Sequence, residues 1–181
     1  VPVAVLGGVC LALSDDLPWL LLGVPLLAGI RLVLNLIDGQ VARRSGTARP
    51  FGEVLNELGD RVADVFFIGG LAFVAAVGPL LGLSAVIAAL LASYAGVVAR
   101  ATGAPRGYGG VMSKPGRMIV LAVAAPLAFA LGAGWPLVAG AWIILLGSLI
   151  TLAQRLRSTW RWHARQPYDE AATPDGGEGR P

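Results

Sequence analysis

The chain has 181 residues, of which 56% are hydrophobic and 14% are charged, and its formal net charge is +3. Soluble domains carry about 25% charged residues, so this composition excludes an ordinary soluble domain and indicates that lipid surrounds most of the chain. Cys10 and His163 are single residues of their kinds, which excludes a disulfide framework and zinc sites rich in cysteine or histidine. Any metal ion must be held by oxygen.

Six apolar segments approach the roughly 20 residues that a membrane-spanning helix needs. Stretches rich in Gly, Pro or Ser separate them, as is typical of turns. In chain order the predicted helices cover residues 1–13, 17–41, 52–77, 80–100, 117–131 and 135–154. Because the first is short and lacks an initiating Met or a signal-peptide pattern, we interpret it as a helix truncated at its start.

Basic residues alternate between the predicted connections. They lie around the second and fourth connections and after the sixth helix, at Arg43, Arg44, Arg49, Arg100, Arg106, Lys114, Arg117, Arg155, Arg157, Arg161 and Arg165. Cytoplasmic loops accumulate Lys and Arg, so these regions are expected in the cytoplasm. Asp15 and Asp16 then lie at the opposite membrane surface, where we expect them to cap the second helix.

The pattern predicts an all-α integral membrane protein with six transmembrane helices and a polar cavity that faces the cytoplasm. Its Ala, Gly and Arg content is typical of GC-rich bacterial genomes, which favours a bacterial cytoplasmic (inner) membrane. Residues 1–154 are predicted to form one membrane domain. Residues 155–181 are predicted to be a basic interfacial segment, anchored by Trp160 and Trp162, followed by a disordered tail.

Polar chemistry concentrates between residues 35 and 64, where the second predicted helix ends and the third begins. Positions on one face of the second helix are Arg31, Asn35, Asp38 and Ala42. Positions that step by four along the third are Gly52, Asn56, Asp60 and Asp64, with Glu53 and Glu57 beside them. Ionisable groups inside a membrane normally face a partner or a cavity, so the two faces are expected to form a shared site.

The spacing of these residues resembles the CDP-alcohol phosphotransferase superfamily, whose signature DxxDGxxARx8GxxxDxxxD lies at the cytoplasmic ends of helices two and three of six. The matching positions are Asp38, Gly39, Ala42, Arg43, Gly52 and Asp60. The resemblance implies that Gly39, Ala42, Arg43 and Gly52 leave room for and bind a nucleotide. Close helix packing is the alternative role for the small residues.

The first and third aspartates of the signature are Asn35 and Asn56 in this chain. In the family the four positions hold divalent metal, so the resemblance implies Mg2+ or Mn2+, one or two ions, held by Asn35, Asp38, Asn56 and Asp60. An amide oxygen can bind such an ion but brings no charge. Three outcomes stay open: metal retained with help from neighbouring carboxylates, altered metal or substrate preference, or a non-catalytic binder.

The resemblance implies further roles. Asp60 is expected to be the catalytic base for the acceptor hydroxyl. Substrate binding is expected to involve Arg31, Asp64, Lys114 and Arg117. For Arg31 the alternative is a buried counter-ion of Asp38 or Asp60, and for Lys114 and Arg117 it is ordinary cytoplasmic positive charge.

The expected function is a membrane enzyme of phospholipid synthesis that moves a phosphatidyl group from a CDP-linked lipid donor to an alcohol and releases CMP. The partners would be the donor, a small alcohol or phosphorylated alcohol, membrane lipids and a second copy in a homodimer, with no nucleic acid. The alternatives are a catalytically silent CDP-lipid binder or partner subunit and a small transporter, which requires a polar path through the bundle.

Overall fold

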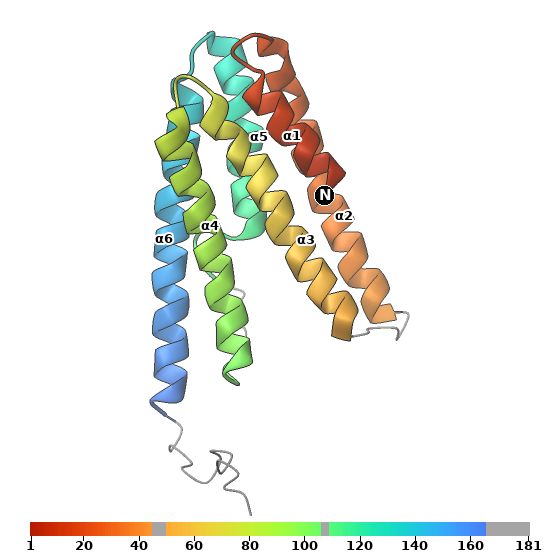
Figure 1. The fold of residues 1–181 in the computed structure, drawn as a ribbon, viewed down its shortest axis with the longest axis vertical. Helices are drawn as coiled ribbons and strands as arrows, with labels where there is room; N and C mark the ends of the chain where they lie inside the picture. The colour runs from red at the N-terminus through yellow and green to blue at the C-terminus, as the bar shows by residue number, and fades with distance from the viewer. Residues whose placement is uncertain (45–49, 106–108, 166–181) are drawn as a thin grey trace, which may run out of the picture.

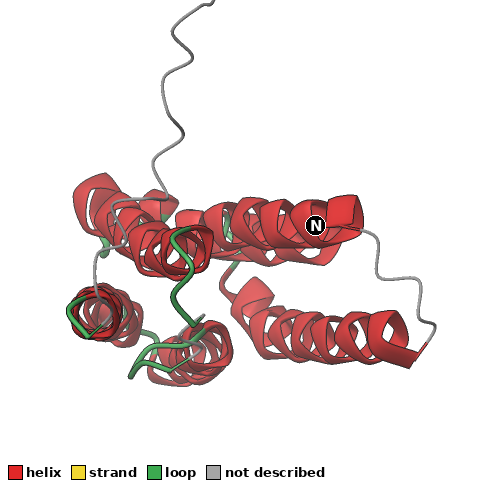
Figure 2. Ribbon diagram, turned by 90° about the horizontal axis from the view of Figure 1, so that it is seen from below, coloured by secondary structure: helices red, strands yellow, loops and turns green. Residues whose placement is uncertain are grey.

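The computed structural model describes residues 1–44, 50–105 and 109–165. In this part of the chain, six α-helices and two short 3-10 helices are joined by loops, without a strand (Figures 1 and 2). In order they are α1 (Pro2–Ala12), η1 (Pro18–Leu22), α2 (Gly23–Arg44), α3 (Pro50–Gly69), η2 (Gly70–Phe73), α4 (Gly78–Ala101), α5 (Lys114–Leu131) and α6 (Trp135–His163). The predicted all-α class is confirmed.

The observed ends of α3, α5 and α6 differ from the predicted ones. Helix α3 ends at Gly69, and the chain tightens into η2 where Gly70 packs on α1. Helix α5 begins at Lys114, which places this lysine in its first turn. Helix α6 continues past 154 to His163, because the intervening RLRSTWRWH contains neither Gly nor Pro to stop it. Arg155 therefore belongs to the bundle.

Four segments of the described chain are long and apolar enough to cross a membrane: Pro18–Asn35, Gly78–Ala101, Lys114–Leu131 and Trp135–His163. Helix α1 is apolar but has only 11 residues. Helix α3 carries the polar residues of the signature along its first half. A multi-pass membrane protein is thus supported, while the number of six membrane crossings stays a prediction.

The antiparallel helices place the basic and acidic connections at opposite ends of the bundle. The α1–α2, α3–α4 and α5–α6 connections lie together at the upper end in Figure 1, and α2 and α4 end toward the other. At the upper end, Asp15 does not cap the second helix as expected. Its Oδ2 accepts a hydrogen bond from the Ala75 backbone N–H at 2.7 Å, so it joins two connections.

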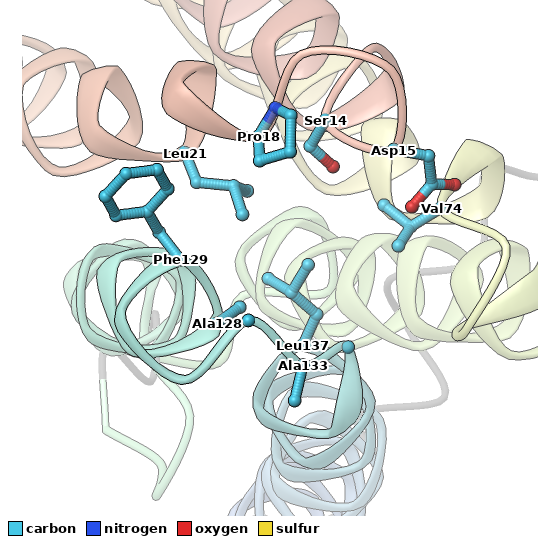
Figure 3. Close-up of a pocket in the computed structure, with 11 residues that line it drawn as sticks. Ser14, Asp15, Pro18, Leu21, Val74, Ala128, Phe129, Ala133 and Leu137 are labelled. Carbon is cyan, nitrogen blue, oxygen red and sulfur yellow. The ribbon is translucent and has the colours of Figure 1, made fainter.

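A small cavity of about 210 Å³ lies beside this upper contact (Figure 3). Ser14, Asp15 and Val74 line one side, and Ala128, Phe129, Ala133 and Leu137 from the α5–α6 corner line the other. The Ser14 hydroxyl donates to the Leu11 carbonyl at 2.7 Å. This cavity is distant from the polar signature, which lies toward the other end of the helices.

Small residues let the helices approach closely in the core. A Cβ on Gly8 would lie 2.2 Å from the Phe66 carbonyl oxygen, and one on Gly82 would lie 2.5 Å from Ala72. Close contact between backbones is the usual basis of helix association in a membrane, where hydrophobic burial supplies little. These contacts fix α3 against α1, and η2, which follows α3, against α4, and so fix the direction in which the polar face of α3 points.

Candidate active site

Polar side chains from α2, α3 and α5 meet inside the bundle. Arg31 and Asn35 come from α2, Asp60 and Asp64 from α3, and Lys114 from the first turn of α5. The pairs on α2 and α3 are each one turn apart, so both members point to the same side of their helix. The structure thus brings the second and third helices face to face, as the sequence predicted.

Asp64 is the most buried of these groups, with no exposed surface. Its Oδ1 accepts a hydrogen bond from Arg31 Nη2 at 3.0 Å, and its Oδ2 lies 3.2 Å from Arg117 Nη2. One carboxylate therefore connects α2, α3 and α5 through two buried ion pairs. A buried charge needs such partners, because its desolvation costs several kcal/mol.

Arg117 is occupied by protein groups on several sides. Besides Asp64, its Nη1 donates to the Ala89 carbonyl at 2.9 Å and its Nη2 to the Ser93 hydroxyl at 3.5 Å, both on α4. The residue is 2% exposed. This burial contradicts the alternative of an ordinary positive charge at the membrane surface. The contacts give Arg117 a structural role in joining α5 to α3 and α4, and its role in substrate binding stays a prediction.

Arg31 has a different partner from those considered in the sequence. The alternative to its predicted role in substrate binding is neutralisation of Asp38 or Asp60, whereas among the described side chains its ion pair is with Asp64. With Asp60 it makes only a long hydrogen bond of 3.4 Å to the backbone carbonyl. The difference arises because α2 and α3 cross so that Arg31 lies beside Asp64, which is one helical turn beyond Asp60 on α3.

Asp60 lies at the centre of the less buried part of the site. Its Oδ1 accepts a hydrogen bond from Asn35 Nδ2 at 3.1 Å and is also ion-paired with Lys114 Nζ. The side chains of Lys114 and Asp60 are 14% and 17% exposed. The carboxylate at the last signature position is therefore held between an amide and an ammonium group.

A cavity of about 230 Å³ opens next to Asp60. Its lining residues come from five helices and the turn before α5: Asn35, Glu57, Asp60, Arg61, Ser93, Ser113, Lys114, Pro115, Arg117 and Arg155. Five of them are neither predicted site residues nor the carboxylates beside them: Arg61, Ser93, Ser113, Pro115 and Arg155. Arg155 was assigned to the interfacial segment, and only the continuation of α6 brings it to the cavity.

The newly found cations are themselves tethered. Arg61 Nη2 is 2.8 Å from Glu57 Oε1, one turn away on α3. Arg155 Nη1 donates to the Ala92 carbonyl at 2.6 Å and its Nε to the Gly109 carbonyl at 3.3 Å. Hydrogen bonds of this kind hold a guanidinium in one orientation beside the cavity. Arg155, together with Lys114 and Arg117, makes the side of the cavity formed by α5 and α6 basic.

Other predicted site residues lie away from this cluster or outside the description. Asn56 is exposed, and a Cβ on Gly52 would lie more than 4 Å from the other described heavy atoms, so no described residue packs closely on Gly52. The side chains of Asp38, Ala42 and Arg43, together with position Gly39, lie outside the residues whose surroundings the structure describes.

The oxygen donors of the site determine whether a divalent cation can bind there. The described residues contain no group of three or more His, Cys, Asp or Glu side chains able to hold a metal. Asp60 and Asn35, which are in contact, nevertheless provide two oxygen donors if the Asn35 amide turns. Mg2+ is commonly held by one or two carboxylates and completed by substrate phosphates and water. The residues fit an ion of that kind.

Sequence comparison with known proteins supports the family resemblance that the signature indicates. No family model matches the chain. The phosphatidylinositol phosphate synthase of Mycobacteroides abscessus is 33% identical over 132 residues, which are 70% of this chain and 60% of that protein. The inner membrane protein YnbA of Escherichia coli is 28% identical over 118 residues, which are 65% of this chain and 58% of that protein. The chain thus spans about 60% of the length of these relatives.

A solved structure agrees with the sequence relatives. The crystal structure of Mycobacterium tuberculosis phosphatidylinositol phosphate synthase with CDP-DAG bound matches with a TM-score of 0.66 and 27% identity, over 87% of this chain and 84% of that one. These likenesses support a family of the CDP-alcohol phosphotransferase type. The chain shares its fold and sequence features with bacterial membrane proteins that include lipid synthases.

Proposed function

We propose that this protein is a membrane transferase that moves a phosphatidyl group from a CDP-linked lipid to an alcohol, with release of CMP. The observation that carries the proposal is Asp60, at the last aspartate position of the signature, beside a cavity with basic walls. The likeness to a synthase structure with CDP-DAG bound supports the choice of donor. Phosphoryl transfer needs positioning and charge rather than a nucleophilic side chain.

Asp60 is the residue that accepts the proton of the acceptor hydroxyl. The acceptor oxygen then forms a bond to the phosphatidyl phosphorus, and the bond from that phosphorus to the CMP oxygen breaks. A carboxylate acts in this way when it lies within hydrogen-bond reach of the hydroxyl. Asn35, in contact with Asp60, orients the carboxylate.

A divalent cation held by Asp60 and Asn35, with Asp38 as a further candidate, would supply positive charge to the donor diphosphate. Mg2+ or Mn2+ suits this oxygen donor set. Asn56 is a weaker candidate, because its side chain is exposed. Gly52, with open space where a Cβ would be, leaves room for the nucleotide, and the same role is proposed for Gly39, Ala42 and Arg43.

The acceptor is proposed to be a small alcohol that carries a phosphate. Lys114 and Arg155 border a cavity of about 230 Å³, which suits a polar head group better than a lipid tail. Arg155 is tethered to backbone carbonyls, and such fixed guanidinium groups favour phosphate oxygens. The names of the synthase relatives agree with a phosphorylated acceptor.

A catalytically silent CDP-lipid binder is the second candidate function. Asparagine at two signature positions and the ion pair that engages Asp60 favour it. It predicts that donor binds but no CMP appears with any acceptor. A transporter is disfavoured, since the chain beyond Asp64 continues into buried apolar residues, Phe67 and Ile68 on α3 and Leu71 on η2.

The location follows from the same proposal. The site is placed on the cytoplasmic side of a bacterial inner membrane, where basic residues gather. A homodimer remains a prediction from the family resemblance.

The decisive experiment measures CMP release from CDP-diacylglycerol by the purified chain with Mg2+ or Mn2+, across acceptors that include inositol phosphate and glycerol phosphate. CMP release that depends on one acceptor is expected. Asp60→Asn should lower the rate by about 100-fold or more, because general-base catalysis contributes about 10²- to 10⁴-fold. Donor binding without CMP release would support the silent binder, and an unchanged rate in Asp60→Asn would refute the role of Asp60.

A further inference from the structure

The positively charged side chain of Lys114 lies beside the Asp60 carboxylate, the group that is proposed to bind a divalent cation. The Lys114 ammonium is ion-paired with Asp60 Oδ1, the same oxygen that accepts the Asn35 hydrogen bond. Both side chains are mostly buried, so water screens the pair only partly. An ammonium group paired with this carboxylate lowers its attraction for a divalent cation, because the two positive charges repel each other in a poorly screened site.

The charges around the pair oppose entry of a free cation. Among the described residues of the site and its cavity, the positive ones are Arg31, Arg61, Lys114, Arg117 and Arg155, and the negative ones are Glu57, Asp60 and Asp64. Asp64 is already neutralised by two arginines. Two signature positions that are aspartate in the resembling family are asparagine here and contribute no charge. The described cluster therefore carries an excess of positive charge before any ligand enters.

From this geometry we propose that Lys114 is an internal counter-ion that competes with the divalent cation for Asp60. In the free protein Lys114 neutralises Asp60 and keeps the affinity for metal low. When an anionic ligand enters the adjoining cavity, Lys114 turns from Asp60 to the ligand and leaves the carboxylate to the cation. The lysine lies in the first turn of α5 and lines this cavity, so its flexible side chain reaches both.

The inference rests on the assignment of Asp60 as a metal ligand in the proposed function. It adds a specific consequence: the free protein binds metal weakly because of one lysine, so metal and anionic ligand favour each other's binding. It also relates to asparagine at two signature positions. Fewer carboxylates are needed to balance the positive charge of the site where the Lys114 ammonium supplies part of that charge in place of a metal ion.

The test measures Mn2+ affinity of the full-length chain in detergent by electron paramagnetic resonance, without nucleotide or lipid substrate. Lys114→Met should bind Mn2+ about tenfold more tightly than the wild type or better, because an adjacent positive charge is removed from a poorly screened site. Lys114→Gln serves as a second variant if Lys114→Met folds poorly. Lys114→Arg keeps the charge and should stay close to the wild type.

Two further variants locate the effect. Arg157→Met removes one positive charge from an exposed position on α6 and should leave Mn2+ affinity unchanged. Asp60→Asn combined with Lys114→Met should abolish the gain. The inference is overturned if Lys114→Met and Lys114→Gln bind Mn2+ no more tightly than wild type, or if Arg157→Met gains as much. CMP release by the wild type, measured separately, would then still support the proposed function.

Discussion

At the scale of single residues, Asp64 and Asp60 differ in burial and in the groups that surround them. Asp64 is fully buried between Arg31 and Arg117, and it ties three helices together. Asp60, one turn earlier on α3, is partly exposed and borders the cavity. This difference in burial supports a structural role for Asp64 and the proposed chemical role for Asp60.

Replacement of Asp64 by Ala should destabilise the protein by about 3–5 kcal/mol, since it leaves two buried guanidinium groups without their carboxylate. Thermal or denaturant unfolding in detergent measures the loss. The matched control is Glu57→Ala on the same helix, whose ion pair with Arg61 is 22% exposed on both sides. That change should cost about 1 kcal/mol or less. Equal losses in the two variants would contradict the structural role of Asp64.

At the scale of helices, glycines on α1 and η2 determine how closely α1 approaches α3 and η2. Gly8 lies against the backbone of Phe66, and Gly70 lies against Gly8. Gly29 on α2, in contrast, would place a Cβ in open space. Position in the packing, rather than residue type, decides which of these glycines is required.

We expect Gly8→Ala to destabilise the bundle by about 1–3 kcal/mol, because the new methyl group overlaps a carbonyl oxygen and forces the helices apart. Gly29→Ala is the control. It should be neutral or stabilise by up to about 1 kcal/mol, since alanine favours a helix more than glycine does. Unfolding midpoints of both variants check this, and a Gly8→Ala variant as stable as Gly29→Ala would contradict the close contact.

At the scale of the whole molecule, the bundle separates charge between its two ends. The α1–α2 connection, which contains Asp15 and Asp16, lies at the upper end in Figure 1, and the last turns of α4 and α6, which contain Arg100 and Arg161, lie toward the other end. Because cytoplasmic regions are rich in Lys and Arg, the proposed site and its cavity should open toward the cytoplasm.

Cysteine labelling tests this orientation. In a Cys10→Ala background, which removes the one cysteine of the chain, Asp16→Cys should react with a membrane-impermeant maleimide in intact cells. Ser158→Cys, near the end of α6, should react only after the membrane is permeabilised. Both introduced positions are exposed in the structure. Labelling of Ser158→Cys in intact cells would reverse the proposed orientation.

The sequence by itself determined the helical class and the approximate helices, because the apolar segments and their Gly and Pro boundaries are local features of the chain. The signature spacing likewise placed Asn35 and Asp60 on faces that meet. The tertiary structure alone decided the partner of Arg31, the burial of Arg117, the ion pair of Lys114 and the presence of Arg155 at the cavity. These depend on how α2, α4, α5 and α6 cross α3, and crossing angles come from packing between segments distant in sequence.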